Sequence, residues 1–456
     1  MKNKRKKSKP LRTIHTNAAG IDIGAKEIYI AIPEEGCEKS VRRFDCFTDD
    51  LHEAAKWMKE HNIDSIAMES TGVYWIPIYQ LFESYGFKQY LVNARHVKNV
   101  PGRKTDVKDS QWLQYLHSVG LLDSSYIPED RVVVIRSFLR HRDSLIKAAS
   151  SHVQRMQKSL TQMNIQLHNV ISDITGETGL KIITSILSGN HDPVKLSMLK
   201  NKKIKASKKK IIKSLTGNYR DEHLFTLRQS LESYQFCHQQ INRCDEEIEK
   251  RLKEFESASN TDKDNPQSSS TLGPKQRKAG NSPSFDLQGH MYRIFGTDVT
   301  RVDGISAVTA QVLFSVVGAN LDEFPTSKHF CSWIALSPQN KISGGRILSS
   351  KTKRTNNKAA QAFRLSALSL SRSKSYLGHF YRKMKARNGA PKAITATAHK
   401  LARIFYKLVK EKLDYDESVF IKEQKRYQIQ KIQYLKKQAK TLGLQLVKAD
   451  LVQSVT

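Results

Sequence analysis

A single carboxylate interrupts the apolar stretch near the start of the chain, and this feature constrains the fold more than any other. The run from Ala19 to Ile30 is rich in small and β-branched apolar residues, and Gly24 divides it into two strand-like halves. Asp22 lies within the first half. Burying a carboxylate in an apolar strand costs free energy unless a cation or a hydrogen-bond donor faces it. Asp22 is therefore either on the exposed face of a half-buried strand or a ligand of a metal ion.

Three further carboxylates follow in segments that a fold can bring to the same place. Glu69 ends a second strand-like segment that begins at Ile66. Asp106 and Asp109 are spaced i, i+3 at the start of a helical pattern, where both fall on one face and negative charge is favoured. Taken singly, each acid is better explained as a cap or a solvated side chain. The ordered set on strand, strand and helix instead predicts a site for Mg²⁺ or Mn²⁺, which prefer oxygen ligands and can promote phosphoryl transfer.

The net charge indicates a polyanionic partner. The 456 residues include 76 Lys and Arg against 44 Asp and Glu, so the formal charge is +32. Nucleic acid is the usual partner of so basic a chain, although a ribosome-associated or membrane-surface protein would share the charge. No apolar run is long enough to span a membrane, and no signal-peptide core follows the first residues, so we expect a cytoplasmic, nucleoid-associated protein. The five cysteines lack CxxC spacing, which gives no indication of a zinc site or disulfide framework.

Periodicity distinguishes the first half of the chain. A basic arm at 1–16 precedes alternating strand and helix patterns at 17–145, and acids at strand ends and on a late helix fit a RuvC- or ribonuclease H-like α/β domain. Apolar residues in steps of three and four continue through 146–256, where Asp245 is one of two interruptions. This pattern predicts two long helices, paired either within the chain or as an intermolecular coiled coil. Eight lysines within residues 200–213 indicate a phosphate-contacting segment between them.

The second half begins with a change of composition. Residues 257–290 are rich in Ser, Asn, Pro and Gly and predict a flexible linker. We expect a mostly α-helical domain at 291–415 and a basic helical tail at 416–456. The segment from Val302 to Ala310 resembles the glycine turn of a helix-hairpin-helix module, which offers backbone N–H groups to phosphates, although a plain helix start would have the same pattern.

The acidic motifs resemble the N-terminal domain of the IS110/IS1111 family of transposases. They are GIDIG, MESTGVYW and KTDVKDS, and they contain Asp22, Glu69, Asp106 and Asp109. Three later motifs, VDGISAVTA, ALSP and SGGRILS, resemble the C-terminal transposase domain of the same family. The resemblance covers about residues 17–170 and 295–412.

What this resemblance implies is a site-specific DNA recombinase of a mobile element. The four acids match the D-E-D-D positions that bind Mg²⁺ in the family, and Ser343 matches the serine that forms a covalent protein–DNA intermediate. A serine hydroxyl is a weak nucleophile unless a base or a metal ion activates it. The implied partners are double-stranded DNA from the element ends and the target, and a structured guide (bridge) RNA. Sharing of sites during strand exchange implies a homodimer or tetramer.

Three positions depart from the family pattern. Ile342 stands where a second serine is common, Ala335 where glycine is usual, and Ser306 where the hairpin has its second glycine. Because one hydroxyl of the usual pair is missing beside Ser343, other serines of the region are alternative nucleophiles: Ser337, Ser349 and Ser350.

Three other functional classes stay open. A RuvC-type junction resolvase would hydrolyse DNA with water and form no adduct through Ser343. A sugar-kinase or actin-like ATPase also suits GIDIG as its first phosphate loop, and would bind a nucleotide. A non-enzymatic RNA-binding protein would use only the basic segments, so that an Asp22→Ala substitution would leave its activity intact.

Overall fold

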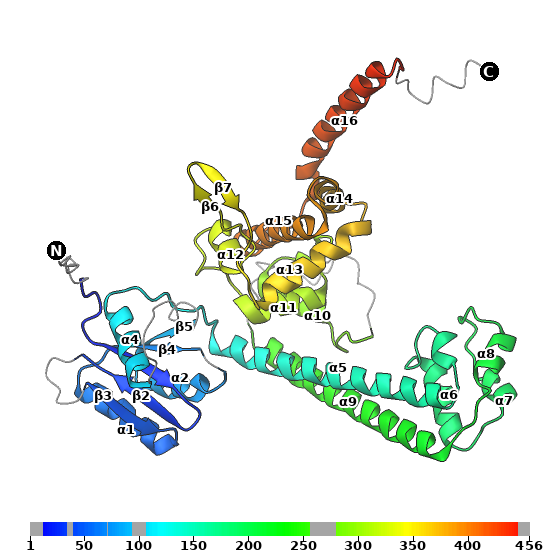
Figure 1. The fold of residues 1–456 in the computed structure, drawn as a ribbon, viewed down its shortest axis with the longest axis horizontal. Coiled ribbons are helices and arrows are strands. Elements are labelled where there is room, and N and C mark those ends of the chain that lie inside the picture. Colours follow the sequence, from blue (N-terminus) through cyan, green and yellow to red (C-terminus); the bar gives the residue numbers. More distant parts are fainter. Residues whose placement is uncertain (1–11, 34–39, 71, 94–105, 256–279, 446–456) are drawn as a thin grey trace, which may run out of the picture. The chain divides into compact units, whose positions relative to one another are not determined.

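The computed structural model describes residues 12–33, 40–70, 72–93, 106–255 and 280–445, without the side chains of 419–428 (Figure 1). It divides into two compact units, Met1–Ile127 and Pro128–Thr456. This division falls earlier in the chain than the expected boundary after residue 145. Most of the basic arm and most of the linker lie outside the described residues. So do residues 34–36, whose sequence Glu-Glu-Gly predicts a turn.

A five-stranded mixed sheet forms the centre of the first unit, in the order β3-β2-β1-β4-β5. The strands are β1 (Ala18–Ile23), β2 (Glu27–Ala31), β3 (Val41–Asp45), β4 (Ser65–Glu69) and β5 (Lys88–Val92). The first three strands pair antiparallel, whereas β1, β4 and β5 run parallel to one another. The predicted strands and the predicted α/β class of this domain are confirmed.

The two faces of this sheet have different cores because successive side chains of a strand point to opposite faces. Ile21 and Met68 pack with apolar residues of α1 (Thr48–Glu60) and α2 (Trp75–Ser84). Ala67 on the opposite face packs with residues of α4 (Asp106–Ser118). Asp22 and Glu69, whose strand neighbours belong to the first core, therefore lie on the α4 face.

Helix α1 begins without a side-chain cap. Asp49 and Asp50, the polar residues that a helix start at Leu51 would use as caps, lie in its first turn instead, and the N-cap residue is Phe47, without a side-chain hydrogen bond. Carboxylates in the first turn still suit the positive end of the helix dipole. The local stabilisation is thus electrostatic rather than a side-chain cap.

The second unit begins with two long helices, α5 (Asp130–Gln162) and α9 (Asp221–Lys253). They pack against each other within the chain, which is the intramolecular alternative of the two predicted arrangements. Arg142 contacts Asp245 and Ser159 contacts Thr226, so positions later in α5 meet positions earlier in α9 and the pair is antiparallel. Asp245 interrupts the apolar pattern because it is buried and pairs with Arg142 across the interface.

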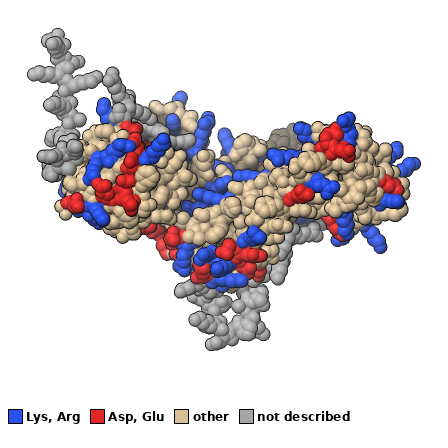
Figure 2. Space-filling model, turned by 90° about the horizontal axis from the view of Figure 1, so that it is seen from below, with Lys and Arg blue, Asp and Glu red and all other residues tan. Residues whose placement is uncertain are grey.

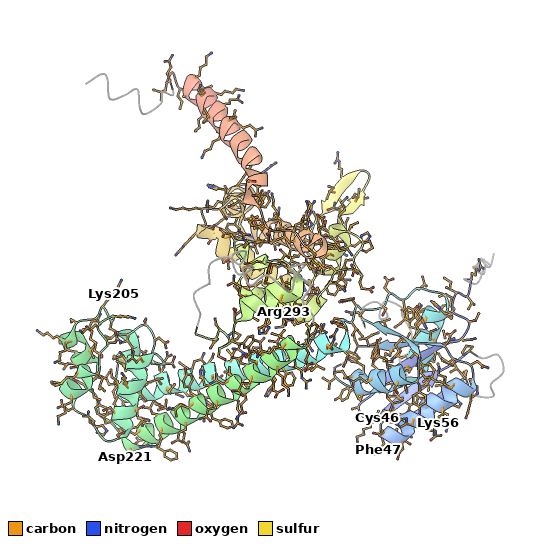
Figure 3. The ribbon with its side chains drawn as sticks, turned by 180° about the vertical axis from the view of Figure 1, so that it is seen from behind. Cys46, Phe47, Lys56, Lys205, Asp221 and Arg293 are labelled. Carbon is orange, nitrogen blue, oxygen red and sulfur yellow. The ribbon has the colours of Figure 1, made fainter. Side chains whose placement is uncertain are left out.

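Three short helices form a lobe at the turn between α5 and α9 (Figure 1): α6 (Glu177–Leu187), α7 (Pro193–Met198) and α8 (Lys208–Ser214). They share a core that includes Ile183, Leu196 and Ile211. All lysines of residues 200–213 except Lys200 are exposed. Figure 2 shows basic side chains projecting from this lobe, at the right of the view, with acidic ones among them, and Figure 3 labels Lys205 before α8. The lysine-rich segment is therefore a solvent-facing part of a folded lobe.

The rest of the second unit is mostly helical, as predicted. Its elements are α10 (Leu287–Phe295), α11 (Ala307–Val317), α12 (Ser327–Trp333), β6 (Lys341–Ser343), β7 (Arg346–Ser349), α13 (Lys358–Ser369), α14 (Tyr376–Asn388), α15 (Ala390–Glu411) and α16 (Ile421–Thr441). Phe405 of α15 contacts the rings of Phe295, Phe330 and Phe363, so α15 is the centre of an aromatic core. Helix α10 begins inside the range expected to be linker, and α14 and the β6–β7 hairpin were not predicted. Within the described ranges, no helix is long and apolar enough to cross a membrane.

Candidate functional site

The register of two parallel strands places two of the predicted acids side by side. Ile21 of β1 is paired with Met68 of β4, and the next residues in each strand are Asp22 and Glu69. Both carboxylates lie near the carboxyl ends of adjacent parallel strands, and both are partly buried on the α4 face. This end of the sheet is where α/β folds commonly bind ligands.

A glycine brings α4 onto this face. A Cβ at Gly20 would lie 2.2 Å from the backbone nitrogen of Gln114 and 2.4 Å from the carbonyl oxygen of Ser110, so only glycine permits the observed contact. The Gln114 amide also donates a hydrogen bond to the carbonyl oxygen of Ala18 at 3.2 Å. Because Gln114 lies over the start of β1, the helix runs back along the strand and its N-terminal turn, with Asp106 and Asp109, extends toward Asp22.

The charges of the four acids act on one another. The pKa of Asp22 is raised from 3.8 to about 6. Burial is the largest cause of this shift, and the nearby carboxylates of Asp106, Asp109 and Glu69 contribute the rest. Burial and like charge both disfavour the ionised carboxylate. The structure therefore gathers all four predicted acids into a region of concentrated negative charge.

This donor set fits a divalent metal in its chemistry. Carboxylate oxygens suit Mg²⁺ and Mn²⁺, and a cation would relieve the repulsion that raises the Asp22 pKa. Among the described residues, however, no three His, Cys, Asp or Glu side chains are already arranged to hold an ion.

A cleft of about 880 Å³ opens beside Asp22 and Asp106. Its other wall includes Tyr29, which is paired with Asp22 across β1 and β2, and Arg43, which is paired with Tyr29 across β2 and β3. Side chains of directly paired residues share a face, so the three form a row on the α4 side. The cleft thus combines acids that suit a metal with a cation that suits a phosphate.

Arg43 is held in place by acids of its own sheet. Its guanidinium pairs with Glu27 and, at 2.9 Å, with Asp45. The Tyr29 hydroxyl donates a hydrogen bond to Glu27 at 3.3 Å. Sequence reasoning missed Tyr29 and Arg43, and only the register of the three-stranded meander would have found them. Phe47, labelled in Figure 3 beside Cys46, is 73% exposed at the edge of the cleft.

Ser343 lies at the tip of a β-hairpin in the second unit. It is the last residue of β6 and is paired with Arg346, so only Gly344 and Gly345 form the turn. Their φ angles of +54° and +74° fit a type I′ turn, which demands positive φ at both positions. The glycines after the serine are thus explained by the hairpin, and Ser343 is exposed to solvent. The acids belong to the first unit, so the two parts of the predicted chemistry come from different units.

The alternative serines occupy different environments. Ser337 and Ser349 are partly buried, and the Ser349 hydroxyl accepts a hydrogen bond from the backbone of Lys351 at 3.4 Å. Ser350 is exposed and lines a second cleft, which is described below. Ser343 and Ser350 are therefore the more accessible of the four hydroxyls.

Two departures from the family pattern have structural explanations. Ala335 has a φ of +58°, which is the left-handed conformation that favours glycine. Ser306 replaces a glycine but caps α11, because its hydroxyl accepts a hydrogen bond from the Thr309 N–H at 3.1 Å. Gly304, with a φ of +94°, keeps the turn that the sequence predicts before this helix.

Comparison with known families agrees with the two-part fold. A model of the IS110 DEDD domain, described as "Transposase", matches residues 19–165. A second, described as "Transposase IS116/IS110/IS902 family", matches residues 297–382. No curated protein matches the chain. Fold and family matches define an enzyme that acts on DNA, the transposase of an insertion element. The chain belongs to the IS110 family of transposases.

Proposed function

We propose that this transposase cuts and rejoins DNA with a composite site, made of the acidic cluster in the first unit and a serine in the second. The observation that carries the proposal is the gathering of Asp22, Glu69, Asp106 and Asp109, together with an Asp22 pKa that burial and then these neighbouring acids raise. The hairpin that presents Ser343 to solvent supports the second part.

In this mechanism the Ser343 hydroxyl attacks the phosphorus of a DNA phosphodiester. A serine–phosphate ester forms as the bond to the leaving sugar oxygen breaks, the serine proton passes to a base, and the leaving oxygen is protonated. A hydroxyl of another DNA end then attacks the ester, which rejoins DNA and restores the serine. The four acids would hold Mg²⁺, or Mn²⁺ in its place, which when bound stabilises charge at the reacting phosphate. Arg43 lies in the same cleft as Asp22, where its guanidinium, paired with Glu27 and Asp45, offsets part of the negative charge.

The partners follow from the charge and from the number of strands. The formal charge of +32 suits two nucleic acids at once, DNA from the element ends and target together with a structured guide (bridge) RNA. The exposed lysines of residues 200–213 are suited to RNA phosphates. Recombination breaks four strands, so we propose a homodimer or tetramer that is associated with the nucleoid.

A denaturation-resistant DNA–protein adduct tests the mechanism. Purified protein would be incubated with RNA from the element, end-labelled DNA and Mg²⁺, and adducts counted on a denaturing gel. We expect the adduct to be lost in Ser343→Ala and in Asp106→Ala. Ser349→Ala and Ser350→Ala serve as matched controls and should retain it. An adduct that survives Ser343→Ala but disappears in Ser350→Ala would move the nucleophile to the second cleft.

The second candidate is a RuvC-type endonuclease that uses water and no serine. It is favoured by the separation of the acids and Ser343 into different units, because the acidic cleft alone could direct hydrolysis. Metal-dependent cleavage without an adduct, undiminished in Ser343→Ala and abolished in Asp106→Ala, would establish this candidate and exclude the composite mechanism.

A further inference from the structure

A second cleft, of about 820 Å³, lies in the second unit between α14, α15 and the segment that follows β7. Four cationic side chains line it: Lys351, Lys392, Lys400 and Arg403. No Asp or Glu is among the described residues that line the cleft. Four positive charges facing one cavity without a carboxylate favour an anionic ligand.

The cationic lining follows from the periodicity of α15. Lys392, His399 and Arg403 are spaced by seven and four residues and fall on one face of the helix. Leu401 and Phe405 occupy the opposite face and are buried in the aromatic core. The aromatic core fixes the orientation of α15 about its own axis. It therefore also fixes the side of the helix from which the cationic side chains project.

Two lysines of α15 that lie outside the cleft form ion pairs with carboxylates. Lys407 pairs with Glu411 at 3.9 Å, and Lys410 pairs with Asp322 at 2.6 Å. Lys392 and Arg403 form no ion pair with a carboxylate in the described part of the chain. Lys392 and Arg403 therefore carry positive charge that no carboxylate of the described residues pairs with.

The cleft also offers aromatic surface and a fixed ammonium group. Lys400 donates a hydrogen bond to the Tyr376 hydroxyl at 2.5 Å, and its Nζ lies 4.4 Å from the Tyr376 ring centroid and 4.7 Å from that of Phe380. These contacts restrict a side chain that is otherwise flexible. Phe380 itself lines the cleft. Cations beside an aromatic ring form the usual lining of grooves that bind single nucleic acid strands.

The serine hairpin arises from the rim of this cleft. The backbone of Gln339 before β6 donates a hydrogen bond to the carbonyl oxygen of Lys351 after β7, at 3.0 Å, and Pro338 and Thr352 form a bridge. Pro338, Lys351 and Thr352 all line the cleft. A strand bound in the cleft therefore runs beside the base of the hairpin that carries Ser343.

We propose that this cleft binds the sugar–phosphate backbone of a nucleic acid strand, with Lys392 and Arg403 each contacting a phosphate. The identity of the bound strand rests on the proposed function, in which the candidates are the reacting DNA and the guide RNA. Both have a sugar–phosphate backbone that the cleft could bind. The binding itself depends on neither the metal nor the serine.

The test is equilibrium binding of the full-length protein to a fluorescent single strand, followed by anisotropy in EDTA from 0.1 to 1 M salt. The variant is Lys392→Gln with Arg403→Gln. The matched control is Lys385→Gln with Lys407→Gln, which removes two exposed lysines of α14 and α15 that do not line the cleft. DNA and RNA of one sequence form the two arms.

We expect the cleft variant to reduce the salt slope of log K by about 1.4, since each single-strand phosphate contact contributes roughly 0.7. The same counterion release predicts roughly 25-fold weaker binding at 0.1 M salt, while the control changes little. A loss in the DNA arm alone assigns the cleft to the reacting strand, a loss in the RNA arm alone assigns it to the guide, and a loss in both supports a shared backbone site. Equal losses in variant and control, or none, would overturn the proposal. Because no metal is present, failed adduct formation would leave this result unaffected.

Discussion

The charge concentrated around Asp22 makes a quantitative prediction for the Asp22→Asn variant. In the folded protein, burial and the neighbouring acids raise the Asp22 pKa from 3.8 to about 6. The native state therefore binds this proton more tightly than the unfolded chain does. Between these two pKa values the free energy of unfolding falls as pH rises, and above pH 6 the full penalty persists. At about 1.4 kcal/mol per pKa unit, the penalty at neutral pH is at most about 3 kcal/mol.

The Asp22→Asn substitution removes this penalty, so the first unit should become more stable at pH 7.5 and change little at pH 4. Hydrogen exchange of the full-length protein, read by mass spectrometry on β1 and β4 peptides, measures the effect locally. We expect exchange to slow by up to about 100-fold at pH 7.5, because each pKa unit is a factor of ten. Peptides of α11 in the second unit provide an internal reference.

The matched control is Asp123→Asn, which removes an exposed carboxylate from the same unit. It should leave exchange in β1 unchanged at both pH values. Slowing of equal size at pH 4 and pH 7.5 in Asp22→Asn would refute the electrostatic reasoning, since a neutral carboxyl at pH 4 carries no penalty. If hydrogen exchange does not slow at either pH, the ionised Asp22 carboxylate does not destabilise the first unit.

Four further outcomes are expected. Mg²⁺ should raise the melting temperature of the wild type more than that of Asp22→Asn in a thermal scan, because the carboxylate would be a ligand. Gly20→Ala should cost roughly 1–3 kcal/mol in denaturant unfolding and reduce DNA cleavage, because its Cβ meets the backbone of Gln114. Asp245→Ala should cost about 3–5 kcal/mol by leaving Arg142 buried without its partner, whereas Arg142→Met with Asp245→Leu should recover most of the loss in the same assay. Ala335→Gly should raise stability by up to about 1 kcal/mol by removing a left-handed alanine, and an unchanged or lower denaturation midpoint would contradict this.

The acidic cluster was predictable because its members follow local periodicities. Asp22 and Glu69 are each the polar member of a strand pattern, and the i, i+3 spacing of Asp106 and Asp109 places them together on a helix. Tyr29 and Arg43 could not be found this way. Their position beside Asp22 depends on the register of β1, β2 and β3, which turn lengths and side-chain packing set together.

Long-range pairing explains a second feature that the sequence did not predict, the burial of a charged residue between the two long helices. Asp245 interrupts an apolar pattern, and the sequence around it gives no reason for a buried charge. The reason is Arg142, 103 positions away, which meets it only once α5 and α9 have packed. Local patterns predict which face of a helix is apolar, but they do not identify a partner on another helix.

The hairpin at Ser343 was missed for a different reason. Its strands are short and largely exposed, so they lack the alternation that marks a half-buried strand. Glycines beside a serine can let a backbone approach a phosphate closely, yet the positive φ angles of Gly344 and Gly345 are already explained by a two-residue turn. Ser343 is thus an exposed residue beside a two-residue glycine turn, which its sequence context did not indicate.

The two clefts differ in charge in the way that the proposed composite reaction would require. The cleft beside Asp22 contains more carboxylates than cations, so it repels a phosphate unless a metal is present. The cleft beside the hairpin is lined by cations without carboxylates among its described residues, so its charge favours a phosphate backbone and it lacks the acidic ligands that Mg²⁺ prefers. A DNA phosphate with its metal complements both charge distributions. In the proposed mechanism, the second unit would therefore recruit the strand and the first unit would activate its phosphate.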